Sequence, residues 1–379
     1  MTKLSWGMIG GGEESQIGGA HRIAAGLDGA FRFAAGALDI DAARGRGFAI
    51  RLGAEEDRAY GDWRSMLAGE AARPDRLDLV TVATPNATHY EITKAFLEAG
   101  FNVLCEKPMT VTTAEAEEIV ATARQAGRLC AVNFGYSGYP LVRQMKAMVA
   151  QGDLGRVRLV VAEFAHGFHA DAADADNPRV RWRYDPAQAG VSSVLADAGS
   201  HALHMACFVT GQQVARVSAD FASCIEGRAL EDDAALAFRM SGGTVGRLWT
   251  SAVAVGRMHG LTLQVFGEKG GLSWAQEQPN QVIWTPLSEP SRILERGSQA
   301  LAPLAQRGSR LAIGHAEGLY GAFGNLYADL AAAIRAQKAG DIIDLGNHPV
   351  PTAEEGLHSV AAIHAAAESA RAQGAWVEV

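Results

Sequence analysis

The first third of the chain alternates short apolar runs with longer amphipathic ones. The short runs are rich in β-branched residues and predict strands, and the longer runs have helical periodicity. This alternation is typical of βαβ units around a parallel sheet. The predicted strands span residues 5–10, 31–38, 77–84, 101–105 and 128–134, and the predicted helices span residues 17–27, 41–52, 87–99 and 113–125.

After about residue 136 the pattern changes. A helix is predicted at residues 141–150, and it is followed by the strand-like runs VRLVVAEF, ALAFRM, TVGRLWTSAV, LTLQVFG and GLSWA. Such runs, separated by turns, predict an antiparallel sheet with one packed face. Long helical patterns over residues 318–337 and 354–373 close the chain, and residues 289–314 are expected to form a surface loop.

These patterns predict two domains. Residues 1–135 should form an α/β Rossmann domain, doubly wound around a parallel sheet. Residues 136–379 should form an α+β domain with a large, open, mainly antiparallel sheet. The C-terminal helices of this second part could pack back on the first domain.

Composition narrows the range of partners and compartments. The net charge of −8 is spread along the chain and the basic residues form no dense cluster, which argues against nucleic acid and anionic membranes. The four cysteines lie in apolar stretches without a CxxC pair, as expected of a reduced, cytoplasmic protein. No export signal and no run of about 18 apolar residues is present, so neither secretion nor a membrane span is expected.

A glycine-rich turn follows the first predicted strand. A strand that runs into glycines and then a helix offers backbone N–H groups and a positive helix end to a pyrophosphate. Gly10, Gly12 and Gly18 are the candidates for a dinucleotide site. Five residues separate the second and third of these, unlike the usual G-x-G-x-x-G, and a plain tight turn is the alternative.

Asp39 stands where the second predicted strand ends. A carboxylate there can accept hydrogen bonds from the adenosine ribose and would repel a 2′-phosphate, which favours NAD over NADP. Alternatively, Asp39 is a solvated turn residue, or Asp41 caps the next helix.

The sequence Glu106-Lys107-Pro108 follows the strand that ends at Cys105. Parallel sheets bind ligands at the carboxyl ends of their strands, so Lys107 is expected to point into the cofactor cleft. Its ammonium could stabilise the alkoxide that develops as a hydride leaves carbon. Taken alone, a Glu-Lys-Pro segment also fits a solvated loop.

Asp197 and His201 form a second candidate pair. Asp197 is expected at the N-cap or in the first turn of a helix, and a spacing of four places the two side chains on one face. A carboxylate beside an imidazole fixes its tautomer and raises its basicity. The alternatives are an unrelated cap and histidine, or a metal site completed by His204; no further ligand stands nearby, so no metal is expected.

Together these segments resemble the glucose-fructose oxidoreductase, inositol dehydrogenase and MocA family, written Gfo/Idh/MocA. The resemblance covers essentially the whole chain. It rests on GMIGGG with IGGAHR, VATPNATHYEITKAFLEAGFNVLCEKPM, WRYDPAQAG before DAGSHALH, LQVFGEKGGLSW and the closing GLHSVAAIHAAAESARAQGAWV.

The resemblance implies roles for individual residues. Gly10, Gly12 and Gly18 would hold the pyrophosphate, and Thr84, Pro85, Asn86 and His89 would line the cofactor. Glu106 and Lys107 would border the nicotinamide, and Asp197 and His201 would complete the catalytic group. The second domain would bind substrate and mediate formation of a homodimer or homotetramer.

Three features depart from the family pattern: the enlarged glycine loop, Ser192-Ser193 where glycines are common, and Phe134-Gly135-Tyr136-Ser137 without the arginine often found there. Further substrate-pocket candidates come from aromatic, amide, arginine and imidazole side chains, although interface or core packing fits each of them equally. They are Asn133, Tyr136, Tyr139, Trp182, Arg183 and His315.

The sequence therefore predicts an oxidoreductase that transfers hydride between a sugar or cyclitol hydroxyl and NAD, with NADP as a second possibility. Two alternatives stay open. One is an enzyme that retains NAD and uses a transient oxidation for elimination or glycoside cleavage. The other is a cofactor-binding sensor, against which the intact Lys107, Asp197 and His201 argue.

Overall fold

The computed structural model describes residues 2–177 and 180–379, which divide into two compact units. The first comprises the described residues up to Thr110 together with Ala114–Gly135 and Tyr320–Leu357. The second comprises Val111–Thr113, Tyr136–Leu319 and His358–Val379. Within the described ranges, no helix combines the length and the apolar character needed to cross a bilayer.

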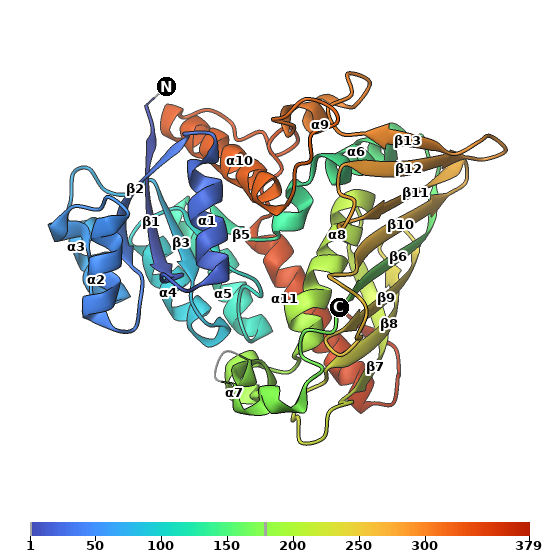
Figure 1. Cartoon of the computed structure of the whole chain (residues 1–379), viewed down its shortest axis with the longest axis horizontal. Coiled ribbons are helices and arrows are strands. Elements are labelled where there is room, and N and C mark those ends of the chain that lie inside the picture. The colour runs from blue at the N-terminus through green and yellow to red at the C-terminus, as the bar shows by residue number, and fades with distance from the viewer. Residues whose placement is uncertain (1, 178–179) are drawn as a thin grey trace. The chain divides into compact units, whose positions relative to one another are not determined.

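The first unit is built on a five-stranded sheet in the order β2-β1-β3-β4-β5, and every neighbouring pair is parallel. The order reverses at β1, which places the turn after β1 where doubly wound sheets bind nucleotides. The strands are β1 (Leu4–Gly10), β2 (Phe31–Ala37), β3 (Leu79–Ala83), β4 (Val103–Cys105) and β5 (Cys130–Val132). This confirms the predicted Rossmann fold (Figure 1).

The helices of this unit are α1 (Gln16–Leu27), α2 (Ala42–Arg51), α3 (Trp63–Ala71), α4 (His89–Glu98), α5 (Thr113–Ala126) and α10 (Leu319–Ala339). The sequence patterns missed α3, since this nine-residue helix buries only Met66 and Glu70 and so lacks a clear apolar stripe. Its start carries a local signal nonetheless, because Asp62 and Ser65 form a capping box.

Helix α10 packs against the strands of the first unit although it lies late in the chain. The Tyr327 ring lies 5.9 Å from the ring of Trp6 and 5.7 Å from that of Phe31, edge to face in both cases. The first unit therefore draws on a segment almost two hundred residues after its last Rossmann strand.

The second unit is built on a nine-stranded sheet in the order β13-β12-β11-β10-β6-β9-β8-β7-β14. Only β6 and β9 pair in parallel, so the predicted, mainly antiparallel sheet is confirmed. The strands are β6 (Val157–Ala165), β7 (Val214–Ala222), β8 (Asp233–Met240), β9 (Val245–Ser251), β10 (Leu261–Gly267), β11 (Gly270–Ala275), β12 (Gln281–Pro286), β13 (Arg292–Glu295) and β14 (Val377–Glu378).

The helices of this part are α6 (Pro140–Gln151), α7 (Pro186–Ala189), α8 (Ser200–Thr210), α9 (Pro303–Arg307) and α11 (Ala353–Arg371). Helices α6, α8 and the later turns of α11 lie on one face of the nine-stranded sheet (Figure 1). Proline at the start of α6 and a left-handed glycine at the end of both α6 and α8 set the limits of these helices.

The prediction of a long surface loop over residues 289–314 missed the regular structure in this segment. The segment contains β13, which pairs with β12, and the short helix α9. The rest is held by the buried guanidinium of Arg296, which donates to the side chains of Asn280 and Glu317 and to the backbone carbonyl of Leu311. The segment is held by hydrogen bonds to one buried cation and not by a periodic apolar face, so its structure could not be predicted from hydrophobic periodicity.

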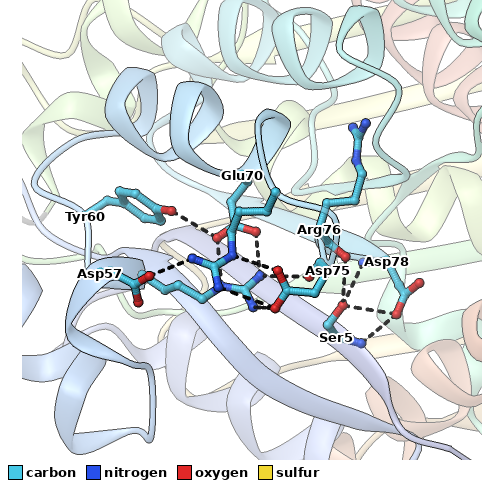
Figure 2. Close-up of polar contacts among 9 residues, drawn as sticks. Ser5, Asp57, Tyr60, Glu70, Asp75, Arg76 and Asp78 are labelled. Carbon is cyan, nitrogen blue, oxygen red and sulfur yellow. Dashed lines mark hydrogen bonds and ion pairs between the residues drawn. The ribbon is translucent and has the colours of Figure 1, made fainter.

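A buried ion-pair network fixes α3 in the first unit (Figure 2). The Glu70 carboxylate accepts from two nitrogens of Arg58 and, over 3.1 Å, from the Tyr60 hydroxyl. Asp75 lies 3.3 Å from Arg58 and also accepts from Arg73. Burial, with Glu70 adding to it, raises the pKa of Tyr60 to about 12. The network joins α3 to the loops on either side of it.

We predict that Glu70→Gln destabilises the first unit by roughly 3 kcal/mol, because it leaves the Arg58 charge buried with a weakened set of acceptors. The control is Glu91→Gln, which breaks an ion pair with Arg64 whose side chains are 57% and 66% exposed. This control should change stability by less than about 1 kcal/mol. Urea unfolding measures both, and equal small losses would contradict the assignment.

Candidate active site

The turn between β1 and α1 is too tight for side chains. Gly10 and Gly11 have positive φ angles of 73° and 64°. A Cβ on Gly11 would lie 1.7 Å from Cε of Met8, and one on Gly18 would lie 2.2 Å from the Gly11 carbonyl oxygen. Ser15 caps α1 by accepting from the Gly18 N–H. The result is an open backbone cradle at a helix N-terminus, which fits a pyrophosphate.

The sequence prediction included Gly10, Gly12 and Gly18 but not Gly11. The run Gly10-Gly11-Gly12 could have indicated Gly11, because it contains one more glycine than the usual spacing requires and glycine readily adopts a positive φ angle. Gly12 lies beside Asp39: a Cβ there would be 3.2 Å from Asp39 Oδ2. The cradle and the predicted ribose-binding carboxylate are therefore adjacent.

Asp39 is held in place by Arg44. Two nitrogens of the guanidinium donate to the carboxylate over 2.7 and 2.8 Å, and the Asp41 N–H donates over 2.9 Å. The hydrogen bonds from Arg44 lower the pKa of Asp39. The carboxylate is ionised at neutral pH, as the predicted preference for NAD requires. Asp41 also caps α2, as the alternative interpretation expected.

His89 ties the turn after β3 to the turn after β4. Thr84 follows β3, and Pro85 and Asn86 lead into α4. The two ring nitrogens of His89 lie 2.8 Å from the carbonyl oxygens of Thr84 and Pro108. Since carbonyls only accept, both nitrogens donate and the ring is an imidazolium.

His89 is protonated although its side chain is buried. Burial acts to lower the pKa of His89, but Cys105 and the two carbonyls outweigh it and raise the pKa to about 9. A fixed cation therefore joins the two turns that the family resemblance places around the cofactor.

We predict a pH-dependent contribution of His89 to stability. The folded pKa exceeds the unfolded value of about 6.5, so the stabilisation is complete below about pH 6.5 and is lost as the pH rises through about 9. The difference in melting temperature between the native chain and His89→Gln should shrink over that interval. His315→Gln, on an exposed loop, is the control; a difference independent of pH would contradict the imidazolium.

Glu106 is a buried carboxylate at the carboxyl end of β4. It accepts from Nε2 of His21 over 2.9 Å, from the Asn133 amide nitrogen and, over 3.1 Å, from the N–H of Lys107. Burial acts to raise the pKa of Glu106, but the bond from His21, the charge of Lys107 and the bond from Asn133 lower it overall. Glu106 is thus an anion directly beside Lys107.

A line of buried hydrogen bonds leads to Glu106 from the sheet. The Trp6 indole donates to the Thr81 hydroxyl over 2.9 Å, and that hydroxyl lies 3.0 Å from the hydroxyl of Tyr327. The Tyr327 hydroxyl lies 2.9 Å from Nδ1 of His21. An indole only donates and a carboxylate only accepts, and one arrangement that satisfies both ends, with a neutral His21, has every proton pointing toward Glu106. His21 and Tyr327 were not predicted as site residues. In the sequence, the IGGAHR segment could have indicated His21, and nothing indicated Tyr327.

In the second unit, Asp197 lies on a π-helical segment, Leu195–Gly199, that leads directly into α8. Of the two predicted positions, the first turn is confirmed and the N-cap is wrong. The cap is supplied by Glu231, whose Oε1 accepts from the Ser192 hydroxyl and the Ser193 and Leu195 N–H groups, over 2.6 to 3.2 Å. Ser192 and Ser193, which depart from the family pattern, therefore anchor the helix that carries Asp197.

Asp197 and His201 have different neighbours. The Asp197 carboxylate accepts from Nε of Arg183 over 3.1 Å, and the Arg183 guanidinium lies 4.5 Å from the ring centre of Trp182. His201 is buried, with the Tyr136 ring 4.7 Å away and edge to face. Of the weaker substrate candidates, Arg183 thus contacts Asp197, Trp182 contacts Arg183, and Tyr136 contacts His201.

Three further histidines lie near this pair, and the sequence prediction missed them. His166 and His169 follow β6, and His259 precedes β10; Nε2 of His259 lies 2.8 Å from the Tyr136 hydroxyl. Burial lowers the pKa of His166 to about 4, and it also lowers the pKa values of His169 and His259. The motif HGFH directly after a predicted strand was the available signal.

Tyr139, His315 and His204 are the remaining candidates, and Tyr139 stacks on Tyr136 with 6.2 Å between the ring centres. Tyr139 is buried, with its ring 5.2 Å from that of Trp274. His315 is exposed; its backbone carbonyl accepts from Arg296 and its N–H donates to the Ala312 carbonyl. His204 is buried and stacks on Phe208. Among the described residues, no group of His, Cys, Asp and Glu has the arrangement of a metal site.

Comparison with known families matches both units. Residues 4–134 match the model of an oxidoreductase family with an NAD-binding Rossmann fold, and residues 142–273 match the GFO/IDH/MocA C-terminal domain. An uncharacterised oxidoreductase of Bacillus subtilis (strain 168), YfiI, is 39% identical over 379 residues, which cover 99% of this chain and 96% of the relative.

Solved structures agree with these matches. The crystal structure of an inositol dehydrogenase homologue from Azotobacter vinelandii with NAD+ superposes with a TM-score of 0.95 at 40% identity, covering 100% of this chain and 98% of that one. A second crystal structure of an inositol dehydrogenase homologue from the same organism, in complex with NADH and myo-inositol, gives a TM-score of 0.92 at 39% identity. It covers 100% of this chain and 98% of that one.

Proposed function

The chain belongs to the Gfo/Idh/MocA family of oxidoreductases, and from this premise we propose that it oxidises a hydroxyl of a sugar or cyclitol with NAD. The family, the Rossmann fold and the NAD cofactor predicted from the sequence are confirmed. The substrate and the roles of individual residues form the proposal.

The observation that carries the proposal is the ionised Glu106 beside Lys107 at the carboxyl end of β4. This pair lies in the unit that holds the glycine cradle, and parallel sheets bind ligands at that edge. We assign to Lys107 the stabilisation of the negative charge that develops on the substrate oxygen. Glu106 keeps a negative charge next to the ammonium and fixes the backbone that carries it.

In the second unit His201 accepts the hydroxyl proton, and the carboxylate of Asp197 favours that transfer electrostatically. Arg183 orients Asp197 through the 3.1 Å hydrogen bond. Bound NAD supplies the hydride acceptor. The Glu231 cap supports these roles, because it fixes the N-terminal end of the helical segment on which Asp197 and His201 both lie.

The cofactor residues follow the sequence prediction. We propose that Gly10, Gly12 and Gly18 hold the pyrophosphate and that Asp39 binds the adenosine ribose and selects NAD over NADP. Thr84, Pro85, Asn86 and His89 line the same cleft. A relative with 39% identity binds NADH and myo-inositol, which supports a cyclitol or a sugar as substrate here.

We also propose a homodimer or homotetramer joined through the nine-stranded sheet. The helices of the second unit lie on one face of this sheet (Figure 1). On the other face Phe266 and Ile283 are 38% and 45% exposed and lie on strands connected through β11. Exposed apolar side chains that follow one face of a sheet suit contact with a second copy.

We predict that the native chain oxidises a cyclitol or pyranose with one equivalent of NADH released per product. Lys107→Met should lower kcat by about 10²- to 10⁴-fold, because it removes the charge that stabilises the oxyanion, and should leave NAD binding intact. Absorbance of NADH across a panel of cyclitols, pyranoses and glycosides measures the activity, and thermal shift measures NAD binding. Lys94→Met, which breaks a surface ion pair with Glu118, is the control.

Two results would contradict this function. Near-native activity of Lys107→Met would make Lys107 a loop residue. Product formation without stoichiometric NADH, by a protein that purifies with nucleotide bound, would indicate an enzyme that retains NAD and uses a transient oxidation.

A further inference from the structure

The glycine turn between β1 and α1 is longer than the turn of the usual dinucleotide motif. Five residues separate Gly12 from Gly18, where G-x-G-x-x-G has two. The backbones at the two ends of the turn still meet, because a Cβ on Gly11 would lie 2.9 Å from Cα of Gly18. A longer loop has more conformations to lose when it binds a ligand, unless other contacts hold it in place beforehand.

Arg22, on the second turn of α1, supplies such a contact. Its guanidinium donates to the Gly11 carbonyl and also, from two nitrogens over 3.5 Å, to the Gly12 carbonyl. The Gly12 carbonyl accepts in addition from the Ser15 N–H over 3.0 Å. Both carbonyls are therefore held on the side of the turn that faces α1.

The fixed carbonyls determine where the next N–H groups point. Both peptide bonds are trans, and a trans peptide unit places its C=O and its N–H on opposite sides. The N–H groups of Gly12 and Glu13 therefore point away from Arg22. Within the described ranges, no backbone or side-chain group accepts from either N–H. Two successive backbone N–H groups that are open in this way suit an anion.

Arg22 is itself held by Phe48 on α2. The guanidinium carbon lies 4.9 Å from the centre of the Phe48 ring. Arg51, three residues further along α2, lies 5.3 Å from the same ring centre and donates to the Glu13 carboxylate over 2.5 Å. One aromatic ring thus connects two arginines to the turn. The second of them draws toward α2 a carboxylate that would repel an anion at the turn.

We propose that Arg22 is a positioning residue for the pyrophosphate of the cofactor. It keeps the carbonyls of Gly11 and Gly12 on one side of the turn, so that the N–H groups of Gly12 and Glu13 face the pyrophosphate. Without the guanidinium these peptide units can rotate, and a carbonyl oxygen that turns toward the pyrophosphate repels it. Arg22 thereby compensates for the enlarged glycine spacing. The inference rests on the proposed cofactor cradle and requires nothing of the substrate.

The experiment measures the Kd of NAD, ADP and adenosine for the full chain, by competition against the fluorescence of bound NADH. Arg22→Met keeps the apolar stem and removes the guanidinium. It should raise the Kd of NAD and of ADP about 10-fold or more. The Kd of adenosine should change by less than about twofold, because adenosine has no pyrophosphate and makes no hydrogen bond to these N–H groups.

Three further variants sharpen the test. Arg22→Lys keeps the charge but not the planar fork, and should recover only part of the lost ADP affinity. Phe48→Leu leaves Arg22 in the chain without its ring contact, and should raise the Kd of ADP about threefold with no change for adenosine. This variant tests the inference even if Arg22→Met does not fold. Arg32→Met removes an exposed arginine at the start of β2 and is the control, with all three Kd values unchanged.

The outcomes separate this inference from the proposed cradle. If the native chain binds neither NAD nor ADP, both are wrong. If it binds both and Arg22→Met leaves the Kd of ADP within about twofold, only the role of Arg22 is wrong. An equal loss for ADP and adenosine would mean that Arg22 supports the fold alone. Native ADP affinity in Arg22→Lys would mean that the charge suffices, and would reject the positioning role.

Discussion

A carboxylate buried at the end of β4 has to be matched by donors from several elements, and this requirement organises the first unit. Glu106 takes one hydrogen bond from His21 on α1, one from Asn133 after β5 and one from the N–H of Lys107. His21 is in turn held by Tyr327 on α10. A late helix therefore belongs to the first unit because a buried charge needs the polar line that this helix completes.

The two units use burial in opposite ways. In the first, hydrogen-bond partners overcome burial, so Glu106 stays an anion and His89 a cation. In the second, burial prevails and His166 and His259 are neutral. Burial is thus outweighed at Glu106 and His89 in the first unit and prevails at His166 and His259 in the second.

Features that depend on hydrophobic periodicity and on the placement of glycines could be predicted from the sequence. It predicted the parallel sheet, the mainly antiparallel sheet, the family and the elements that carry Lys107 and Asp197. It allowed for C-terminal helices on the first domain but could not single out α10 against β1. It could not predict Glu231 at the start of the Asp197 helix either, since these contacts join residues far apart in the chain. His166, His169 and His259 were not predicted for the same reason, because the pKa of a histidine depends on its surroundings in space and not on its neighbours in sequence.

The charge of Glu106 is the most direct test of this account. Infrared difference spectra between the native chain and Glu106→Gln, recorded at neutral pH, would detect a protonated carboxyl by its C=O stretch. We predict a carboxylate signal and no C=O band assigned to Glu106, because its donors hold the pKa of this group below its usual range. A C=O band that disappears in Glu106→Gln would mean that Glu106 is neutral, and would contradict an anion beside Lys107.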